Sequence, residues 1–415
     1  MRRWLVAIGC TLGLAVSFGP YFWLSVGLFL KPMTAEFGWS RTQFSAMYSL
    51  ASVMNVLMLP VCGYIVDRFG PVRAIFVGTV LGALAYASFS LVHSYQSFLI
   101  IACIVGGVGT IASYSSYLAL VPKWFDRNLG IALAIAACGI GVGASTFPHI
   151  INAGIQHSGW RSAFVDAGAV ILIVGLFTLI CFVRDNRGPL PEAERRLPSQ
   201  HAVATEEGWT LGAALRTGDF WFVAIAFAFV LAVTNGVNFH FGALISDRNG
   251  TPAEAATALA TLAIASLVAR LLTGFLLDRI SVRVIATVFF LGQAAATLLL
   301  IPRGVDATIA SAILIGAAQG AELDLLPFIV ARRFGRTAYS KIYSCAFAVI
   351  LIGQVVSPLL LGWTFDRTGS YVLGLSIFPV LSTLAVLLVW FAKTSQAPAK
   401  QSVAQYSDIG THASM

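Results

Sequence analysis

Charged side chains are scarce in this sequence. They account for 11% of its 415 residues, while hydrophobic side chains account for 58%. A soluble globular protein carries roughly 25% charged residues, so this balance indicates a chain built for lipid. The six cysteines all lie in apolar segments and have neither metal-ligand nor redox spacing. We interpret them as small core residues.

The signatures of catalysis and nucleotide binding are also missing. The sequence has no Walker phosphate loop, no zinc-spaced histidine or cysteine cluster and no Gly-x-Ser-x-Gly elbow. The closely spaced Gly139, Gly141 and Gly143 fall inside an apolar stretch, where glycine serves close helix packing. An enzyme, a bound cofactor or metal, and a pump driven by ATP are therefore not expected.

Long apolar stretches, separated by short polar turns, make up most of the chain. A bilayer core about 30 Å thick requires about 20 apolar residues per spanning helix. Continuous runs of this length favour helices over the alternating strands of a barrel. We predict an all-α membrane protein with twelve transmembrane helices, at residues 8–30, 43–66, 73–92, 97–121, 129–151, 162–183, 219–244, 253–277, 283–301, 308–330, 341–363 and 370–391.

Lysine and arginine are distributed unevenly between the two ends of these helices. An even number of spans places both termini on one side, and nineteen basic residues fall on that side. The opposite side has six, namely Lys31, Arg41, Arg161, Arg248, Arg303 and Arg367. Basic flanking residues are retained in the cytoplasm, so we predict cytoplasmic termini in a bacterial inner membrane. The net charge of +8 then reflects orientation in a lipid bilayer rather than a nucleic-acid partner.

The most polar internal stretch divides the chain into two halves. Residues 184–218 combine three prolines with charged residues and contain no pattern of a folded domain, which is typical of a linker. We therefore predict an N-terminal six-helix bundle at 1–183, a cytoplasmic linker at 184–218, a C-terminal six-helix bundle at 219–393 and a disordered cytoplasmic tail at 394–415.

One short segment occurs twice, at the polar end of an apolar stretch in each half. Gly63-Tyr64-Ile65-Val66-Asp67-Arg68 is repeated as Gly274-Phe275-Leu276-Leu277-Asp278-Arg279. This pattern resembles the loop between the second and third helices in each half of major facilitator transporters, and the resemblance covers nearly the whole chain. It implies two pseudo-symmetric six-helix bundles with a substrate cavity between them, and alternating access by rocking of the halves. A conformational latch on the cytoplasmic side would use Gly63, Asp67, Arg68, Gly274, Asp278 and Arg279.

A second resemblance is to the monocarboxylate porters. Lys123-Trp124-Phe125, followed by a glycine-spaced fifth helix, is similar to their pattern, although Asn128–Ala132 departs from it. Arg270 occupies the position at which that family carries the arginine that engages the substrate carboxylate. An arginine inside a span needs an interior partner, a watery cavity or a substrate anion, and its planar fork suits a carboxylate. Snorkelling toward the cytoplasm, or pairing with an acid of the other half, would also satisfy Arg270.

The groups that the family's animal members place near this arginine are missing here. Ser266 stands where they have an acid, and Leu24 where they have a lysine in the first helix. Proton coupling would therefore use other residues, and the candidates are His240, Glu322 and Asp324. The two acids are about 200° apart around a helix, so only one of them is expected to face the cavity.

Polar and aromatic side chains on the helices that line such cavities complete the expected site. They are Tyr21, Tyr114, Tyr117, Asn235 and Asn238, each of which could instead serve helix packing. Together with Arg270 they suggest a cavity with one cation and several hydrogen-bond donors. We therefore predict a secondary transporter whose partners are a small organic monocarboxylate and protons.

Two other functions stay open. Gly130, Gly139 and Gly143 partly reproduce the spaced glycines of antiporter fifth helices, with Ala144 where that motif has proline. An exporter of drugs or siderophore-like compounds in the same fold is therefore the first alternative. A sensor that binds its ligand without moving it is the second, although no appended signalling domain supports it.

Overall fold

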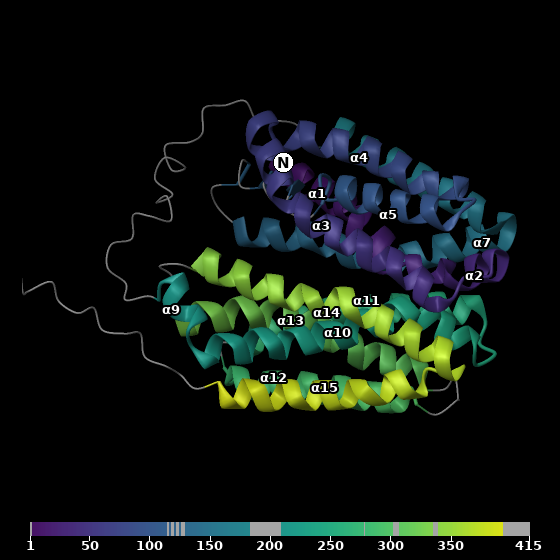
Figure 1. Cartoon of the computed structure of the whole chain (residues 1–415). Coiled ribbons are helices and arrows are strands. Elements are labelled where there is room, and N and C mark those ends of the chain that lie inside the picture. The colour runs from purple at the N-terminus through teal and green to yellow at the C-terminus, as the bar shows by residue number, and fades with distance from the viewer. Residues whose placement is uncertain are drawn as a thin grey trace, which may run out of the picture.

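The computed structural model describes residues 2–113, 116–117, 120–121, 124–125, 129–182, 209–277, 279–301, 307–334 and 339–392. All regular structure in these ranges is helical. Figure 1 shows two bundles side by side, the first in purple to blue and the second in teal to yellow. This is the all-α architecture of two bundles that the sequence predicts.

Each bundle uses one half of the chain. The first half contains α1 (Arg2–Ala15), η1 (Gly19–Trp23), η2 (Val26–Phe29), α2 (Leu30–Phe37), α3 (Arg41–Phe69), α4 (Pro71–Ala87), η3 (Ser88–Leu91), α5 (Tyr95–Gly109) and α7 (Leu129–Cys181). The second half contains α9 (Leu211–Leu215), α10 (Gly218–Ser246), α11 (Pro252–Leu277), α12 (Val282–Leu299), α13 (Thr308–Phe334), α14 (Tyr339–Thr368) and α15 (Val372–Phe391). We call the end of the molecule with the start of α1 and the end of α15 the proximal end, and the opposite end, with α2, the distal end (Figure 1).

The predicted spans correspond to these helices. Ten helices within the described ranges are long and apolar enough to cross a membrane. One of them, α7, joins the fifth and sixth predicted spans through a kink at Gly159, whose φ of 82° interrupts the helix. The fourth predicted span begins with the shorter helix α5, and only part of the remainder of that span is described. All twelve predicted spans therefore have a helical counterpart.

The first span is not the continuous helix predicted at 8–30. α1 ends at Ala15, and the chain continues through the π-helix η1, the 3-10 helix η2 and α2. Pro20 lies within this interrupted segment and has no backbone N–H to donate, so one hydrogen bond of a regular helix is missing there. Two serine hydroxyls donate hydrogen bonds to backbone carbonyls at the break. Ser17 donates to the Leu14 carbonyl at 2.7 Å, and Ser25 donates to the Pro20 carbonyl at 2.8 Å. The interrupted backbone is thereby satisfied inside the protein.

Hydroxyl side chains also mark where spans begin. Ser40 accepts a hydrogen bond from the Gln43 N–H at 3.1 Å before α3, and Thr217 accepts one from the Phe220 N–H at 3.4 Å before α10. Such caps satisfy N–H groups that the first helical turn leaves without partners, at a gain of about 1 kcal/mol each. They fix the starts of the second and seventh spans.

Helices approach most closely where a glycine meets a backbone carbonyl. In the first half, a Cβ added at Gly143 of α7 would lie 1.9 Å from the Ala15 carbonyl oxygen of α1. In the second half, a Cβ added at Gly353 of α14 would lie 2.1 Å from the Ala228 carbonyl oxygen of α10. Both crossings join the first and fifth spans of their half, and neither leaves room for a larger residue.

A second crossing is repeated in the same way. A Cβ at Gly106 of α5 would lie 2.3 Å from the Ala51 carbonyl oxygen of α3. A Cβ at Gly320 of α13 would lie 2.1 Å from the Ser266 carbonyl oxygen of α11. These are the second and fourth spans of each half. The closest backbone packing therefore repeats between the halves, in agreement with the repeat in the sequence.

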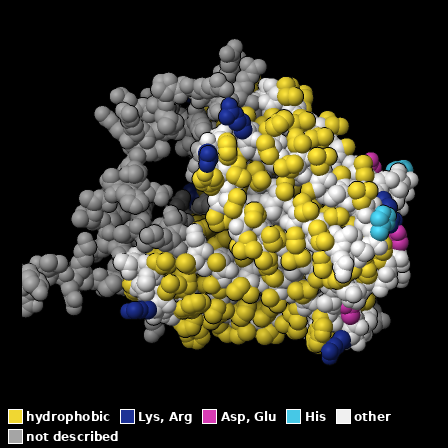
Figure 2. Space-filling model, turned by 45° about the horizontal axis from the view of Figure 1, so that its top comes forward, with side chains coloured by type: hydrophobic (Ala, Val, Ile, Leu, Met, Phe, Trp, Pro, Cys, Tyr) yellow, Lys and Arg dark blue, Asp and Glu magenta, His cyan; other side chains and the backbone are white. Residues whose placement is uncertain are grey.

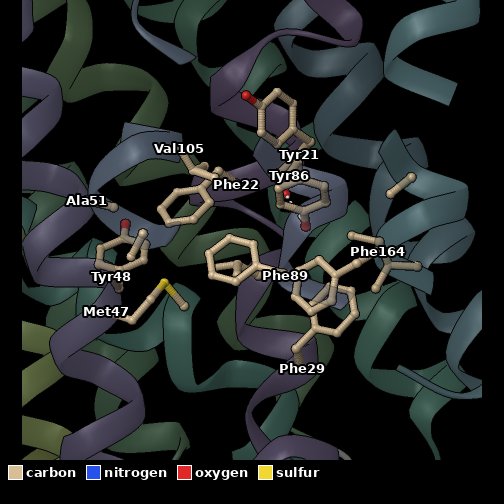
Figure 3. Close-up of a cluster of buried hydrophobic side chains, with 14 of the residues drawn as sticks. Tyr21, Phe22, Phe29, Met47, Tyr48, Ala51, Tyr86, Phe89, Val105 and Phe164 are labelled. Carbon is tan, nitrogen blue, oxygen red and sulfur yellow. Dashed lines mark hydrogen bonds between the residues drawn. The ribbon is translucent and has the colours of Figure 1, made fainter. Parts of the chain in front are cut away.

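An aromatic core fills the distal part of the first half (Figure 3). The rings of Phe29 and Phe164 stack with centroids 3.7 Å apart. The cluster reaches the second half through Phe239 of α10, whose ring centroid is 5.8 Å from that of Phe44 and 4.7 Å from that of Tyr48. Aromatic packing thus contributes to the contact between the halves at the distal end.

Large apolar side chains cover the outside of the bundles. Phe177, Ile173 and Ile180 are 53%, 67% and 72% exposed. Figure 2 shows hydrophobic groups over most of the visible face, with charged side chains at its margins. An exterior of this kind fits the hydrocarbon core of a bilayer.

Candidate functional site

The two halves are joined at the distal end by charged groups. Asp247, which follows α10, lies 2.7 Å from Lys31 of α2 and 2.6 Å from Arg41 of α3. Burial raises the pKa of Asp247, but the hydrogen bonds and positive charges of Arg41 and Lys31 outweigh it and hold the pKa below its ordinary value. The carboxylate is therefore ionised at neutral pH and links one half to the other.

A second carboxylate of the second half binds the start of α3. Asp366 of α14 accepts hydrogen bonds from the backbone N–H groups of Arg41 and Thr42, each at 2.9 Å. A helix N-terminus has unpaired N–H groups and a partial positive charge, so an anion is stabilised there. The Arg41 guanidinium also stacks on the Phe365 ring of α14, 3.5 Å from its centroid. Arg41 thus contacts two segments of the second half, α14 and the residue that follows α10.

His240 lies beneath these charges and is buried. Its Nε2 is 2.9 Å from the Pro358 carbonyl oxygen and 3.2 Å from the Ser45 hydroxyl of α3, while Nδ1 is 2.9 Å from the Tyr371 hydroxyl. A carbonyl oxygen only accepts, so Nε2 is the nitrogen that carries the hydrogen and Nδ1 accepts from Tyr371. His240 thus lies near one end of the seventh span, as predicted, and it contacts Ser45 of the other half.

The polar contacts continue along α3 toward the centre of the molecule. The Tyr48 hydroxyl donates to Asn235 Oδ1 of α10 at 2.9 Å, and the Ser49 hydroxyl donates to the Val355 carbonyl of α14 at 2.6 Å. The sequence analysis identified Asn235 but missed its partner Tyr48 and the neighbouring polar residues of α3. The signal was present, because Arg41, Ser45, Tyr48 and Ser49 recur at spacings of three and four and form one polar face of that helix.

Arg270 is paired within its own half. Its Nε donates to Asp324 Oδ1 of α13 at 3.3 Å, and the two side chains are 32% and 25% exposed. The alternative in which Arg270 pairs with an acid of the other half is therefore not what the structure shows. Its partner is instead Asp324, one of the three proton-coupling candidates.

Glu322 has a different environment from Asp324, as their spacing predicts. Glu322 is buried, and its Oε2 has no hydrogen-bond partner within the described residues. One turn earlier on α13, Gln319 accepts from Asn238 Nδ2 at 3.4 Å, while Asn238 Oδ1 has no partner among the same residues. Asn235 and Asn238 therefore contact different helices, although they are close together along α10.

Two of the three predicted tyrosines line a small cavity inside the first half. Tyr21 and Tyr117 are both buried in the first half and line a cavity of about 10 Å³, which also involves Ser17 and Thr79. A cavity of this size holds about one water molecule, not an organic substrate. Tyr21 also packs on Tyr86, with ring centroids 4.9 Å apart. Tyr114 lies outside the described residues.

The repeated loops lie at the proximal end. A Cβ added at Gly63 or Gly274 would have no atom within 4 Å, so neither glycine is at a helix contact in this structure. Arg68 donates to the Tyr64 hydroxyl, and Arg279 stacks on the Phe275 ring at 3.5 Å. The side chain of Asp67 and the whole of Asp278 are not among the described groups, so the latch stays a prediction.

The architecture and the apolar exterior together define the class of protein: a helical membrane protein built from two bundles. The chain belongs to the Major Facilitator Superfamily, whose sequence profile matches residues 10–249 and 234–409. It is therefore an integral membrane transporter and not an enzyme. The described residues contain no cluster of three or more side chains suited to hold a metal ion.

Three similarities refine this assignment. Monocarboxylate transporter 12 of Rattus norvegicus is 23% identical over 423 residues, which cover 95% of this chain and 86% of that protein. The Fujikurins efflux protein of Gibberella fujikuroi is 30% identical over 214 residues, which cover 50% of this chain and 44% of that protein. The crystal structure of a bacterial homolog to the human lysosomal transporter Spinster shares the fold, with a TM-score of 0.73, 16% identity, and coverage of 94% of this chain and 97% of that chain.

Proposed function

We propose that this transporter carries a small organic monocarboxylate and binds the carboxylate at Arg270. The observation that carries the proposal is the incomplete pairing of this arginine inside a membrane span. Its terminal amino groups have no hydrogen-bond partner within the described residues, since only Nε bonds Asp324. A guanidinium binds a carboxylate through two parallel hydrogen bonds, so these groups suit a substrate anion. The similarity to a monocarboxylate transporter along 95% of the chain supports this choice.

Asp324 is the group that we propose to carry the coupled proton. It neutralises Arg270 in the pair, so a proton on Asp324 would release the arginine for the substrate, and loss of that proton would restore the pair. Glu322 has no ion pair with Arg270 within the described residues, and His240 is engaged at the distal end. Asn238 would orient the substrate, and Asn235 would join the halves through Tyr48.

Alternating access would separate the distal contacts. The polar contacts between the halves gather at Asp247, Asp366, His240 and Asn235, from the distal end inward, so this structure represents the state closed at that end. Rocking of one half against the other would break them and bring the two Asp-Arg loops together at the proximal end. The distribution of basic residues supports a cytoplasmic proximal end, and we propose a bacterial inner membrane as the location.

Uptake of radiolabelled lactate, pyruvate and benzoate into proteoliposomes tests the proposal, with and without an inward proton gradient. Arg270→Ala should abolish uptake, while Arg216→Ala, which removes an exposed arginine directly after α9, should leave it unchanged. Asp324→Asn should keep exchange of labelled for unlabelled substrate but lose the response to the gradient. Uptake that survives Arg270→Ala would refute the role of this arginine, and binding without accumulation would indicate a sensor.

Export is the second candidate function, because a fungal efflux protein is similar to half of the chain. An exporter of cationic drugs would require a cavity acid rather than Arg270. The double variant Glu322→Gln/Asp324→Asn, with Arg270 intact, separates the two functions. Loss of drug efflux with retained carboxylate exchange, or failure of the wild type to take up any acid, would favour the exporter.

A further inference from the structure

A carboxylate of the second half lies between two cations of the first half at the distal end. Asp247 Oδ1 is 2.7 Å from Lys31 Nζ, and Asp247 Oδ2 is 2.6 Å from Arg41 Nη1. Each oxygen therefore has its own cation, which is the arrangement that a binding site for an organic carboxylate requires. The side chains of Lys31 and Asp247 are 36% and 25% exposed, so a solute at the distal end can reach them.

The two cations are held by the first half itself. Lys31 lies on α2 and Arg41 begins α3, so both move with that half. Glu36, the acid on α2, accepts hydrogen bonds from Trp160 at 2.6 Å and Arg161 at 2.5 Å. Since Glu36 is committed to these partners, the ion pairs of Lys31 and Arg41 within the described residues involve only Asp247, a residue of the other half.

Opening of the distal end would remove Asp247 with α10 and leave Lys31 and Arg41 behind. We propose that these two residues form an outer carboxylate site, which Asp247 fills while the distal end is closed and the carboxylate of a small organic anion fills when it is open. The class of anion rests on the proposed function. Exchange of one carboxylate for the other replaces the ion pairs that opening breaks. The transported anion thereby favours the open distal end, because it binds that state better than the closed one.

The test measures binding of radiolabelled benzoate and L-lactate to the full-length protein in lipid nanodiscs. An Arg270→Ala background removes the inner site, so the remaining binding reports the outer one. Asp247→Asn removes the internal occupant but keeps both cations, and we expect binding to tighten by about tenfold. Adding Lys31→Gln should cancel this gain and return binding to the level of the background or below.

Spin labels at the exposed positions Gln96 and Ala253, on the distal ends of the two halves, report whether that end is open. Both Asp247→Asn and the double variant with Lys31→Gln break the ion pairs, and both should open the distal end. Any difference between these two variants in the affinity for the anion is therefore caused by the positive charge of Lys31. The matched control Arg367→Gln removes an exposed cation of the distal end that stacks on Trp363 of its own helix, and it should change neither readout.

Equal binding by Asp247→Asn and the double variant would overturn the outer site and reduce the cluster to a latch. The proposed function has a separate readout, the loss of uptake in Arg270→Ala. Uptake that survives this substitution, together with the expected order of binding at Lys31, would refute the inner site alone.

Discussion

Gly320 lies where the packing of the second half meets the proposed binding site. A Cβ added there would be 2.1 Å from the Ser266 carbonyl oxygen and 3.0 Å from the Arg270 backbone nitrogen. A carbon atom and a carbonyl oxygen approach each other to about 3.3 Å at closest. Alanine at position 320 therefore forces α13 and α11 apart by about 1 Å.

Two measurements should register this displacement in Gly320→Ala. Overpacking of a helix contact costs about 1–3 kcal/mol, so we expect the melting temperature in nanodiscs to fall by a few degrees. The same movement displaces Arg270 from Asp324, to which it is joined by a hydrogen bond of 3.3 Å. Because an error of about 1 Å in placing a functional group costs up to about 100-fold, we expect carboxylate uptake to fall by at least about tenfold.

Gly292→Ala on α12 is the matched control. Its added Cβ would have Leu314 Cδ2 as its nearest atom, at an ordinary contact distance of 3.8 Å. Alanine is favoured over glycine in a helix by about 0.5–1 kcal/mol, so this variant should keep or raise the melting temperature. If Gly320→Ala had the same melting temperature and the same rate of uptake as Gly292→Ala, the crossing of α13 and α11 would not position Arg270. The proposed role of this crossing would then be refuted.

Two further substitutions address the distal charges and the start of the seventh span. Arg41 and Lys31 hold the pKa of Asp247 below its ordinary value of 3.8. The ion pairs therefore contribute their whole share of the free energy of unfolding above that value, and this share is lost as the pH falls through the lowered pKa. The difference in melting temperature between wild type and Asp247→Asn should therefore stay constant between about pH 5 and 8 and shrink only below about pH 4; a decline near neutrality would contradict the ion pairing. Thr217→Ala should cost about 1 kcal/mol in thermal unfolding through loss of the cap on the Phe220 N–H, whereas Thr217→Ser should restore it.

The sequence was sufficient for the spans and the internal repeat because both depend on local properties. A run of about 20 apolar residues has few alternatives to a membrane helix, and the repeat at Gly63 and Gly274 is visible in the residues themselves. The break in the first span contains Gly19-Pro20, but prolines also lie inside continuous helices of this structure, so the dipeptide did not predict a break. The hydroxyl contacts of Ser17 and Ser25 that satisfy the interrupted backbone become clear only in the structure.

The partners of the candidate site residues could not be predicted, because they are set by contacts between distant segments. Asp324 is 54 residues from Arg270, and its spacing from Glu322 indicated that the two acids differ without indicating which one meets the arginine. Tyr21 and Tyr117 were expected beside the substrate, yet the fold directs both into the interior of one half. Helix periodicity defines a face but not the helix that the face will meet.

Glycine-to-carbonyl packing and charge pairing differ in how far they tolerate a change of residue. At Gly143, Gly320 and Gly353, a single added methyl group collides with the backbone of a neighbouring helix, so the two helices have to separate. The ion pairs of Asp247 with Lys31 and Arg41 are made by flexible side chains, and other acidic and basic residues at these positions can form equivalent pairs. At the contact between the halves, the charged pairs therefore leave several substitutions open, whereas Gly27, at which an added Cβ would lie 2.0 Å from the Phe239 carbonyl oxygen, cannot be enlarged unless the two halves move apart.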